Sequence, residues 1–345
     1  MGIARHEARQ SVYNPPENLC IIRYDTTIML LYSICISVLL VFQVPVSSGF
    51  VQEPTTLTTA TGVIYGTLDL PSGIGPFPVA LIIAGSGPTD RDGNSAMLTG
   101  KNNSLQMLAQ SLAAANIASV RFDKRGIGAS AAAGPKEADL RFENYVDDAV
   151  AWVKLLRDDK RFSTVTIIGH SEGALIGAIA AERTHANAFI SVAGVGRCAG
   201  LVLREQLNGK LPAQLFQANE KILRELEAGR TTEDVPPALK SMYRASVQPY
   251  LISWFKYNPV EVVASIKEPI LICQGTTDIQ VAVEEAEALK KAAPTAKLVI
   301  IQGMNHVLKT VPTDSVKQTA SYSDPALPIN VELMKNIIEF VPRAK

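Results

Sequence analysis

Short apolar runs that recur along the chain constrain its fold more than any other feature. Six of them have the continuous hydrophobicity of strands that are covered on both faces. They occupy residues 78–85, 117–123, 163–169, 187–194, 268–275 and 296–303. Alternation of such strands with helices favours right-handed crossover connections. The sequence therefore predicts an α/β fold with a mostly parallel central sheet and helices on both faces.

Apolar residues recur with helical spacing in the segments between most of these runs. The predicted helices lie near residues 102–117, 142–158, 171–184, 282–292 and 329–341. Residues 55–71 are instead rich in Thr, Val, Ile and Tyr around a central Thr-Gly. That pattern predicts an antiparallel hairpin at an edge of the sheet.

The alternation is interrupted between Gly194 and Glu268. No buried strand is predicted there, whereas the segment LPAQLFQANEKILRELEAG has helical spacing and ends in a glycine suited to a helix C-terminus. We expect a helical insertion, or lid, at about residues 197–258 of one folded domain that covers residues 49–345.

The first 48 residues differ in kind from the rest of the chain. Ile28 to Val44 carry no charge, follow arginines at positions 5, 9 and 23, and precede the small-residue run PVSSG. This layout is typical of an export signal, although the apolar run is also close to the ~20 residues of a transmembrane helix. We expect a cleaved signal peptide or an N-terminal membrane anchor, and hence an exported (periplasmic or extracellular) or membrane-anchored protein. Met1 and Met29 are alternative starts.

Charge and cysteine content exclude several classes of function. The chain has 33 Lys plus Arg and 33 Asp plus Glu, so no net field favours nucleic acid as a partner. Its four cysteines lack CxxC spacing, and no His/Cys cluster indicates a metal site. We expect neither metal nor cofactor, and a small-molecule partner that is selected by a local site. The oligomeric state is left open.

The stretch TIIGHSEGALIG, residues 166–177, places Ser171 between two glycines where a predicted strand gives way to a helix. GHSEG fits the GxSxG nucleophile elbow, in which glycines leave space for a sharp turn that exposes the serine. A tight turn with an idle serine is the alternative, so a base and an acid must be found elsewhere.

An acid and a base should follow Ser171 in the order Asp or Glu, then His, each at the carboxyl end of a strand. Asp278 lies just after the predicted strand 268–275, and His306 lies just after the last one. The carboxylate can fix the tautomer of the imidazole and stabilise its charged form. The remaining histidines are in less suitable places; they are His6, His170 and His185. The sequence thus predicts Ser171, Asp278 and His306 as a catalytic triad.

A tetrahedral intermediate also needs two hydrogen-bond donors. One should be the backbone N–H of Glu172, and the other should come from the loop AGSGPTDRDGNS after the first buried strand. We predict the N–H of Ser86, which follows that strand directly, whereas Pro88 has no N–H. The charged residues of this loop are interpreted as an ion-paired brace; they are Asp90, Arg91 and Asp92.

Several segments together resemble the bacterial α/β-hydrolase carboxylesterases, a group also described as serine-aminopeptidase-like hydrolases. The segments are AGSGPTDRDGN, RFDKRGIGAS, GHSEGA, QPYLISWFKYNP, GTTDIQV and GMNH, within a similarity that runs from about residue 55 to the C-terminus. The resemblance implies the α/β-hydrolase fold and the site residues Ser171, Asp278, His306, Ser86 and Glu172. It also implies that the DxRGxGxS segment shapes a turn near the site, through Asp123, Arg125, Gly126, Gly128 and Ser130.

The predicted function is a serine carboxylesterase that hydrolyses small to medium acyl esters through an acyl-enzyme intermediate. Two aromatic residues of the lid, Tyr250 and Trp254, are candidate substrate contacts, and packing of the lid on the core is the alternative use for them. The same triad suits a peptidase, a thioesterase or an acyltransferase. A non-catalytic exported binding protein with the same fold is the alternative from another class.

Two other kinds of motif do not indicate a nucleotide site. GIGASA and GVGRCA fit the dinucleotide fingerprint GxGxxA, but neither opens a short crossover helix back to the sheet. TGKNN departs from a phosphate-binding P-loop at two positions. No nucleotide site is therefore predicted.

Overall fold

Eight strands form one sheet in residues 49–343, the part of the chain that the computed structural model describes. Their order across the sheet is β1-β2-β4-β3-β5-β6-β7-β8; the pairs β1–β2 and β2–β4 are antiparallel and the other pairs are parallel. The strands are β1 (Phe50–Thr59), β2 (Gly62–Pro71), β3 (Phe77–Ile83), β4 (Ala118–Phe122), β5 (Phe162–His170), β6 (Ala188–Val192), β7 (Ile270–Gly275) and β8 (Lys297–Ile301). The predicted signal peptide or anchor, residues 1–48, lies outside the described residues.

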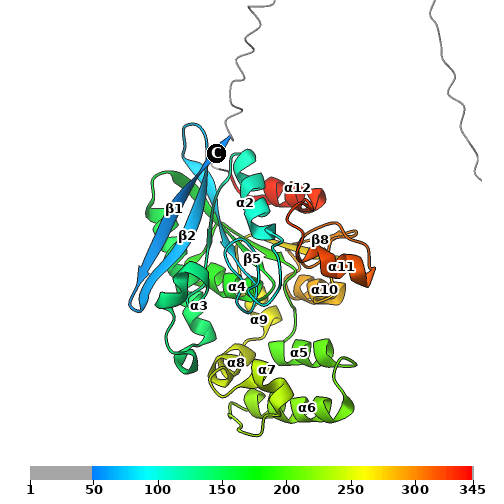
Figure 1. The fold of residues 1–345 in the computed structure, drawn as a ribbon. Helices are drawn as coiled ribbons and strands as arrows, with labels where there is room; N and C mark the ends of the chain where they lie inside the picture. The colour runs from blue at the N-terminus through cyan, green and yellow to red at the C-terminus, as the bar shows by residue number, and fades with distance from the viewer. Residues whose placement is uncertain (1–48, 344–345) are drawn as a thin grey trace, which may run out of the picture. The chain divides into compact units, whose positions relative to one another are not determined.

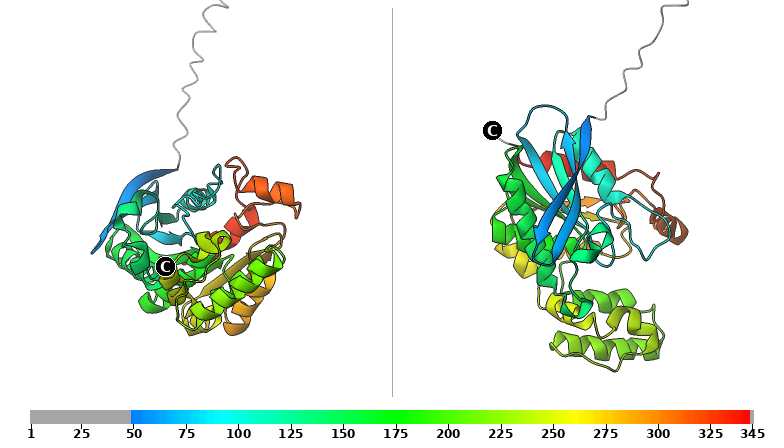
Figure 2. Two further views of the ribbon diagram at one scale, coloured as in Figure 1. Left: turned by 60° about the horizontal axis from the view of Figure 1, so that its bottom comes forward. Right: turned by 60° about the vertical axis from the view of Figure 1, so that its left-hand side comes forward.

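The central strand β3 shows why the sheet is apolar on both faces. Val79, Leu81 and Ile83 pack into one hydrophobic cluster, and the alternate residues Ala80 and Ile82 pack into another. Helices cover both clusters (Figures 1 and 2). One face carries α3 (Phe142–Asp158), α4 (Glu172–Thr184), α9 (Pro259–Ser265) and α10 (Val283–Ala292), and the other carries α2 (Ser104–Ala114) and α12 (Val331–Phe340). The predicted α/β class is confirmed.

The predicted elements reappear with boundaries shifted by a few residues. Strands β1 and β2 form the predicted hairpin, paired from Phe50↔Pro71 to Thr59↔Gly62, and β1 lies at an edge of the sheet. The six predicted buried strands are β3 to β8, and the five predicted helices are α2, α3, α4, α10 and α12. Periodicity was sufficient here because each element packs against others along its length.

The residues between β6 and β7 are helical and contain no strand, as the sequence predicts. They form α5 (Ala199–Leu207), α6 (Ala213–Glu227), the 3-10 turn η3 (Pro237–Leu239), α7 (Lys240–Tyr243) and α8 (Gln248–Phe255) before α9 begins. Gly229 follows α6 with a φ of 76°, a left-handed conformation that glycine adopts without steric penalty. We call the group α5–α8 the insertion; it gathers beyond one end of the strands (Figures 1 and 2).

Shorter elements were harder to predict. Helix α11 (Ser315–Ser321) has only 7 residues, too few for a clear apolar period. Its N-cap is Asp314, whose side chain accepts the N–H of Lys317. Two 3-10 turns, η1 (Gly128–Ala133) and η2 (Glu137–Asp139), precede α3. Within residues 49–343, none of the helices has the length and apolar character needed to span a bilayer.

The strand order reverses at β3, because β4 lies on one side of it and β5 on the other. Ile83 at the end of β3 is paired with Gly169 near the end of β5. Ligands of open α/β sheets bind beyond the carboxyl ends of the strands at such a reversal. The loops after β3 and β5, which carry Ser86 and Ser171, therefore meet where a ligand is expected.

Candidate active site

Ser171 occupies the sharp turn between β5 and α4. Its backbone has φ 55° and ψ −122°, a combination that is rare for a residue with a side chain. A Cβ at Gly169 would overlap the backbone of Gly173, and a Cβ at Gly173 would overlap the carbonyl of Ile83 at the end of β3. The two glycines of GHSEG are thus required for the turn, as the sequence predicts.

Asp278 and His306 lie together in the loops after β7 and β8. The distance between His306 Nδ1 and Asp278 Oδ2 is 2.8 Å, and both side chains are buried. Since a carboxylate only accepts, Nδ1–H is the donor and Nε2 is left as the basic nitrogen. The other carboxylate oxygen, Oδ1, accepts the backbone N–H of Gln280 at 2.8 Å and that of Val281 at 2.9 Å.

These contacts also set the ionisation of Asp278. Burial acts to raise the pKa of its carboxyl group, but the charge of His306 and the hydrogen bonds from the imidazole and the two backbone N–H groups lower it more. The net pKa of Asp278 lies below its ordinary value. The carboxylate therefore remains ionised beside the imidazole.

His170, which the sequence analysis set aside, joins the end of β5 to the loop of His306. Its Nε2 is 2.8 Å from the backbone carbonyl oxygen of His306, and the two rings lie 4.8 Å apart with their planes at 47°. Because a carbonyl only accepts, Nε2–H of His170 is the donor. Burial and the charge of His306 lower the pKa of His170 to about 3, so the ring is neutral at neutral pH.

Ser171 thus lies next to a residue that contacts His306. Its hydroxyl makes no hydrogen bond within residues 49–343. Catalytic hydrogen bonds commonly tighten only when the substrate binds. The structure brings the acid and the base together and sets the serine beside their loop, and the triad as a unit stays a prediction.

Both predicted oxyanion donors lie beside Ser171. Glu172 is the first residue of α4, so its N–H has no acceptor within the helix. Ser86 is exposed, and the preceding Gly85 approaches the serine so closely that a Cβ there would lie 3.1 Å from Cβ of Ser171. The Ser86 carbonyl accepts the hydroxyl of Thr89 at 2.8 Å. The catalytic role of the two N–H groups stays a prediction.

Ion pairs hold the loop after β3 in place. Arg91 pairs with Asp123 at 2.8 Å, and Asp92 pairs with Arg121 at 2.8 Å. Asp90 accepts backbone N–H groups within the loop itself. The expected brace is therefore present for Arg91 and Asp92, whereas Asp90 supports the loop by hydrogen bonds.

The turn after β4, which the family resemblance implies, lies next to this loop. Asp123 accepts the N–H of Ala129 at 2.8 Å, and a Cβ at Gly128 would collide with the same carboxylate. Arg125 Nε donates to Asp148 Oδ2 of α3 at 2.7 Å. Asp123 and Arg125 are thus engaged in holding the shape of the turn.

Lys124, which the sequence analysis did not single out, is buried beside the elbow. Its Nζ donates to the backbone carbonyl of Gly85 at 2.7 Å and lies 2.8 Å from Oε2 of Glu172. The other carboxylate oxygen of Glu172 accepts the hydroxyl of Tyr250 from α8. The ammonium also lies 4.8 Å from the centre of the Tyr145 ring. The available signal was a lysine directly after the carboxyl end of a predicted strand, where site residues gather.

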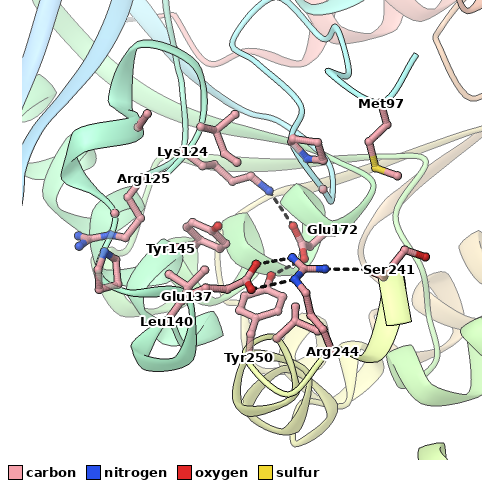
Figure 3. A pocket seen from close by; sticks show the side chains of 18 residues that line it. Met97, Lys124, Arg125, Glu137, Leu140, Tyr145, Glu172, Ser241, Arg244 and Tyr250 are labelled. Carbon is pink, nitrogen blue, oxygen red and sulfur yellow. Dashed lines mark hydrogen bonds and ion pairs between the residues drawn. The ribbon is translucent and has the colours of Figure 1, made fainter. Parts of the chain in front are cut away.

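A cavity of about 590 Å³ adjoins this network (Figure 3). Lys124 and Glu172 form a polar wall, and an ion pair between Glu137 of η2 and Arg244 of the insertion lines another part. Most other lining side chains are apolar or aromatic; they include Met97, Ile127, Leu140, Tyr145 and Val247. The cavity is therefore shared by the loop after β3, the turn after β4 and the insertion.

The two predicted substrate contacts lie in different surroundings on α8. Tyr250 lines the cavity. Trp254 stacks on Phe142 at the start of α3, with ring centres 6.1 Å apart and planes at 4°, and is not among the lining residues. Substrate contact stays a prediction for both residues.

The chain is similar to known hydrolases in sequence. A family model described as serine aminopeptidase, S33, matches residues 99–245. Esterase EstD of Thermotoga maritima is 26% identical over 261 residues, which are 73% of this chain and 61% of EstD. The chain thus spans less than two thirds of the length of that relative.

Solved structures are similar in fold. Est1E of Butyrivibrio proteoclasticus, solved with ferulic acid bound, matches with a TM-score of 0.54 and 20% identity, covering 81% of this chain and 95% of Est1E. The esterase Pf2001 of Pyrococcus furiosus matches with a TM-score of 0.51 and 18% identity, covering 85% and 92% of the two chains. At these identities the likeness is one of fold.

Proposed function

We propose that this chain, which has the α/β-hydrolase fold, is a serine carboxylesterase for small to medium acyl esters. One observation carries the proposal: at one edge of the sheet, the loop after β5 supplies Ser171 on a strained turn, and the loops after β7 and β8 supply Asp278 and His306, which lie 2.8 Å apart. The similarity to an esterase over most of the chain supports the same activity.

In the proposed reaction, Oγ of Ser171 attacks the ester carbonyl carbon while Nε2 of His306 takes the hydroxyl proton. The carbonyl oxygen becomes an oxyanion that accepts hydrogen bonds from the N–H groups of Ser86 and Glu172. His306 then protonates the departing alkoxide, and the alcohol leaves an acylated Ser171. His306 then deprotonates a water molecule, which attacks the acyl-enzyme ester and forms a second tetrahedral intermediate. This intermediate collapses, the carboxylic acid leaves, and Oγ of Ser171 takes back its proton from His306. Asp278 stabilises the imidazolium in both halves of the reaction.

The cavity beside the nucleophile supports the substrate class. The three predicted triad residues are not among its lining residues, but Glu172, which directly follows Ser171, is. Its volume of about 590 Å³ is in the range of small-molecule sites, and its apolar and aromatic lining suits an acyl or aromatic group of moderate size. Tyr250 is the insertion residue that we propose as a substrate contact. In this proposal the insertion acts as the lid of the site.

Replacement of the nucleophile tests the proposal directly. Ser171→Ala should keep the unfolding midpoint of the wild type but lose at least about 10⁴-fold in turnover of p-nitrophenyl acetate and butyrate. A fluorophosphonate probe should label the wild type and spare this variant. The matched control is Ser265→Ala, which changes an exposed serine at the end of α9 and should behave as the wild type.

Two outcomes would contradict the assignment. Turnover and labelling that persist in Ser171→Ala would place the nucleophile elsewhere. A folded wild type that is neither labelled nor active on any ester would favour the non-catalytic binding protein instead.

A peptide bond is the second candidate for the scissile bond, because the matching family model is described as a serine aminopeptidase. A panel of p-nitrophenyl esters, a feruloyl ester, aminoacyl p-nitroanilides and acyl thioesters distinguishes the two, and added alcohols reveal acyl transfer. The feruloyl ester is included because Est1E binds ferulic acid. The proposal expects the highest kcat/KM on an oxygen ester, and a preference for the anilides would replace it by a peptidase.

The N-terminal segment supports a proposal about location. Its uncharged apolar run after several arginines is typical of an export signal or anchor. We propose that the enzyme acts outside the cytoplasm or at the membrane.

A further inference from the structure

The peptide unit between Gly85 and Ser86 has a buried cation on one side. Its carbonyl oxygen belongs to Gly85 and accepts a hydrogen bond of 2.7 Å from Nζ of Lys124. Its N–H belongs to Ser86 and is one of the two proposed oxyanion donors. In a planar trans peptide the C=O and N–H bonds point in opposite directions. The bond to Lys124 therefore fixes the direction of the Ser86 N–H.

The same ammonium reaches the residue that carries the other proposed donor. Nζ of Lys124 lies 2.8 Å from the carboxylate of Glu172, whose backbone N–H begins α4. Both side chains are only 2% exposed. One charge pair thus connects the loop after β3 with the first residue after the nucleophile.

Stability alone is a weak reason for this arrangement. Burying an ion pair costs free energy because both charges lose their hydration. Well-packed apolar residues at the same positions are often as stabilising as the pair. A charged donor also polarises the peptide to which it is bonded, which strengthens the N–H as a donor at its other end. The placement of Lys124 on the Gly85 carbonyl is therefore better explained by the chemistry of the site.

We propose that Lys124 is a positioning residue that orients and polarises the Ser86 N–H of the oxyanion hole through the Gly85 carbonyl, with Glu172 neutralising its charge. Lys124 acts through the peptide and touches no reacting atom. The inference rests on the proposed serine-esterase function.

The first test is the variant Lys124→Met, which keeps the length of the side chain and removes its donor. Loss of one oxyanion-hole donor lowers kcat by roughly 100-fold or more, so a weakened donor should lower kcat by about 10- to 100-fold. KM for p-nitrophenyl butyrate should change by less than about twofold, because the hole acts on the transition state. The inhibition constant of a trifluoromethyl ketone, whose adduct places an oxyanion in the hole, should rise in parallel with the loss of kcat/KM.

The double variant Lys124→Met/Glu172→Gln separates positioning from folding. Lys124→Met alone leaves the Glu172 carboxylate buried without its cation, which should lower the unfolding midpoint. The second substitution removes that charge, so the midpoint should return most of the way to the wild-type value. The proposal expects kcat to remain low, because the Gly85 carbonyl still lacks its donor.

The outcomes are distinct from those that test the esterase itself. Recovery of kcat together with stability in the double variant would show a purely structural role and overturn the proposal. So would fluorophosphonate labelling of Lys124→Met at the wild-type rate. A wild type that is neither labelled nor active would overturn the proposed function, and this inference with it.

Discussion

His170 shows how a single buried side chain can connect the fold with the proposed base. Its ring is held between the end of β5 and the loop after β8, and it donates to the carbonyl of His306. Burial keeps the ring neutral. When His306 takes a proton from Ser171, no second positive charge lies beside it. The contact therefore supports the position of the proposed base.

We predict that His170 makes the free energy of unfolding depend on pH. The pKa of its ring is about 3 in the folded chain, against an ordinary value of 6.5. Between these values the unfolded chain binds a proton that the folded chain does not bind, so stability falls as the pH is lowered through this window. From about pH 7 to pH 5 this histidine should remove about 2 kcal/mol. Urea unfolding at both pH values should show a smaller loss in His170→Gln.

The control for this measurement is His185→Gln. The side chain of His185 is 77% exposed and lies at the end of α4, away from His306. The control should keep the wild-type difference in stability between the two pH values. If His170→Gln loses as much stability as the wild type on acidification, the proposed neutral burial of His170 is wrong.

At the scale of elements, α8 joins the insertion to the core and also forms a wall of the cavity. Trp254 stacks on Phe142, and the hydroxyl of Ser253 accepts the N–H of Phe142 at 2.8 Å. Tyr250, one turn earlier, lines the cavity and donates to Glu172. A single helix thus provides an anchor and a candidate substrate contact.

We predict that replacing Trp254 mainly lowers stability, whereas replacing Tyr250 mainly raises KM. Trp254→Ala should lower the free energy of unfolding by about 2 kcal/mol, because it removes a half-buried aromatic contact, and should change KM by less than about twofold. Tyr250→Ala on the same helix should raise KM several-fold, because it opens the wall of the cavity. Urea unfolding and steady-state kinetics of both variants measure these changes. A raised KM at an unchanged unfolding midpoint in Trp254→Ala would instead make it a substrate contact.

The sequence predicted elements best where burial is two-sided. Strands such as β3 are continuous apolar runs because helices cover both of their faces. Helix α11 was missed because 7 residues hold too few apolar positions to show a period.

Some residues of the candidate site could likewise be proposed from the sequence, whereas others could not. The triad residues could be predicted because their types and chain order carry the signal. The contacts of Lys124 and His170 could not be predicted, because each donates to a backbone carbonyl in another loop, that of Gly85 or His306. A carbonyl is present in every residue, so no residue type in the sequence marks such a contact.

At the scale of the whole described domain, the strand order explains how distant residues gather. Strands β5, β6, β7 and β8 are successive parallel neighbours, so the loops that carry Ser171, Asp278 and His306 leave the same edge of the sheet. Strand β6 lies between the strand of the serine and that of the acid, and its carboxyl end leads into the insertion. The insertion therefore begins at the edge of the sheet that carries Ser171, Asp278 and His306, which supports its proposed role as a lid.

The chain before the sheet gives the last prediction, which concerns where the protein acts. Strand β1 begins at Phe50 and pairs with β2 along its length, so cleavage before Gly49 would leave every strand described in residues 49–343 intact. We predict that the fluorophosphonate-labelled protein is recovered outside the cytoplasm, with a new N-terminus near residue 49 if the segment is a cleaved signal. An intact chain in the membrane fraction would identify an anchor. Leu39→Lys places a charge in the apolar run, which costs about 2.5 to 3.5 kcal/mol at the centre of a membrane segment, and should retain the labelled protein in the cytoplasm. A labelled, uncleaved wild type in the cytoplasm would refute export, because it would show that the apolar run does not target the protein to a membrane.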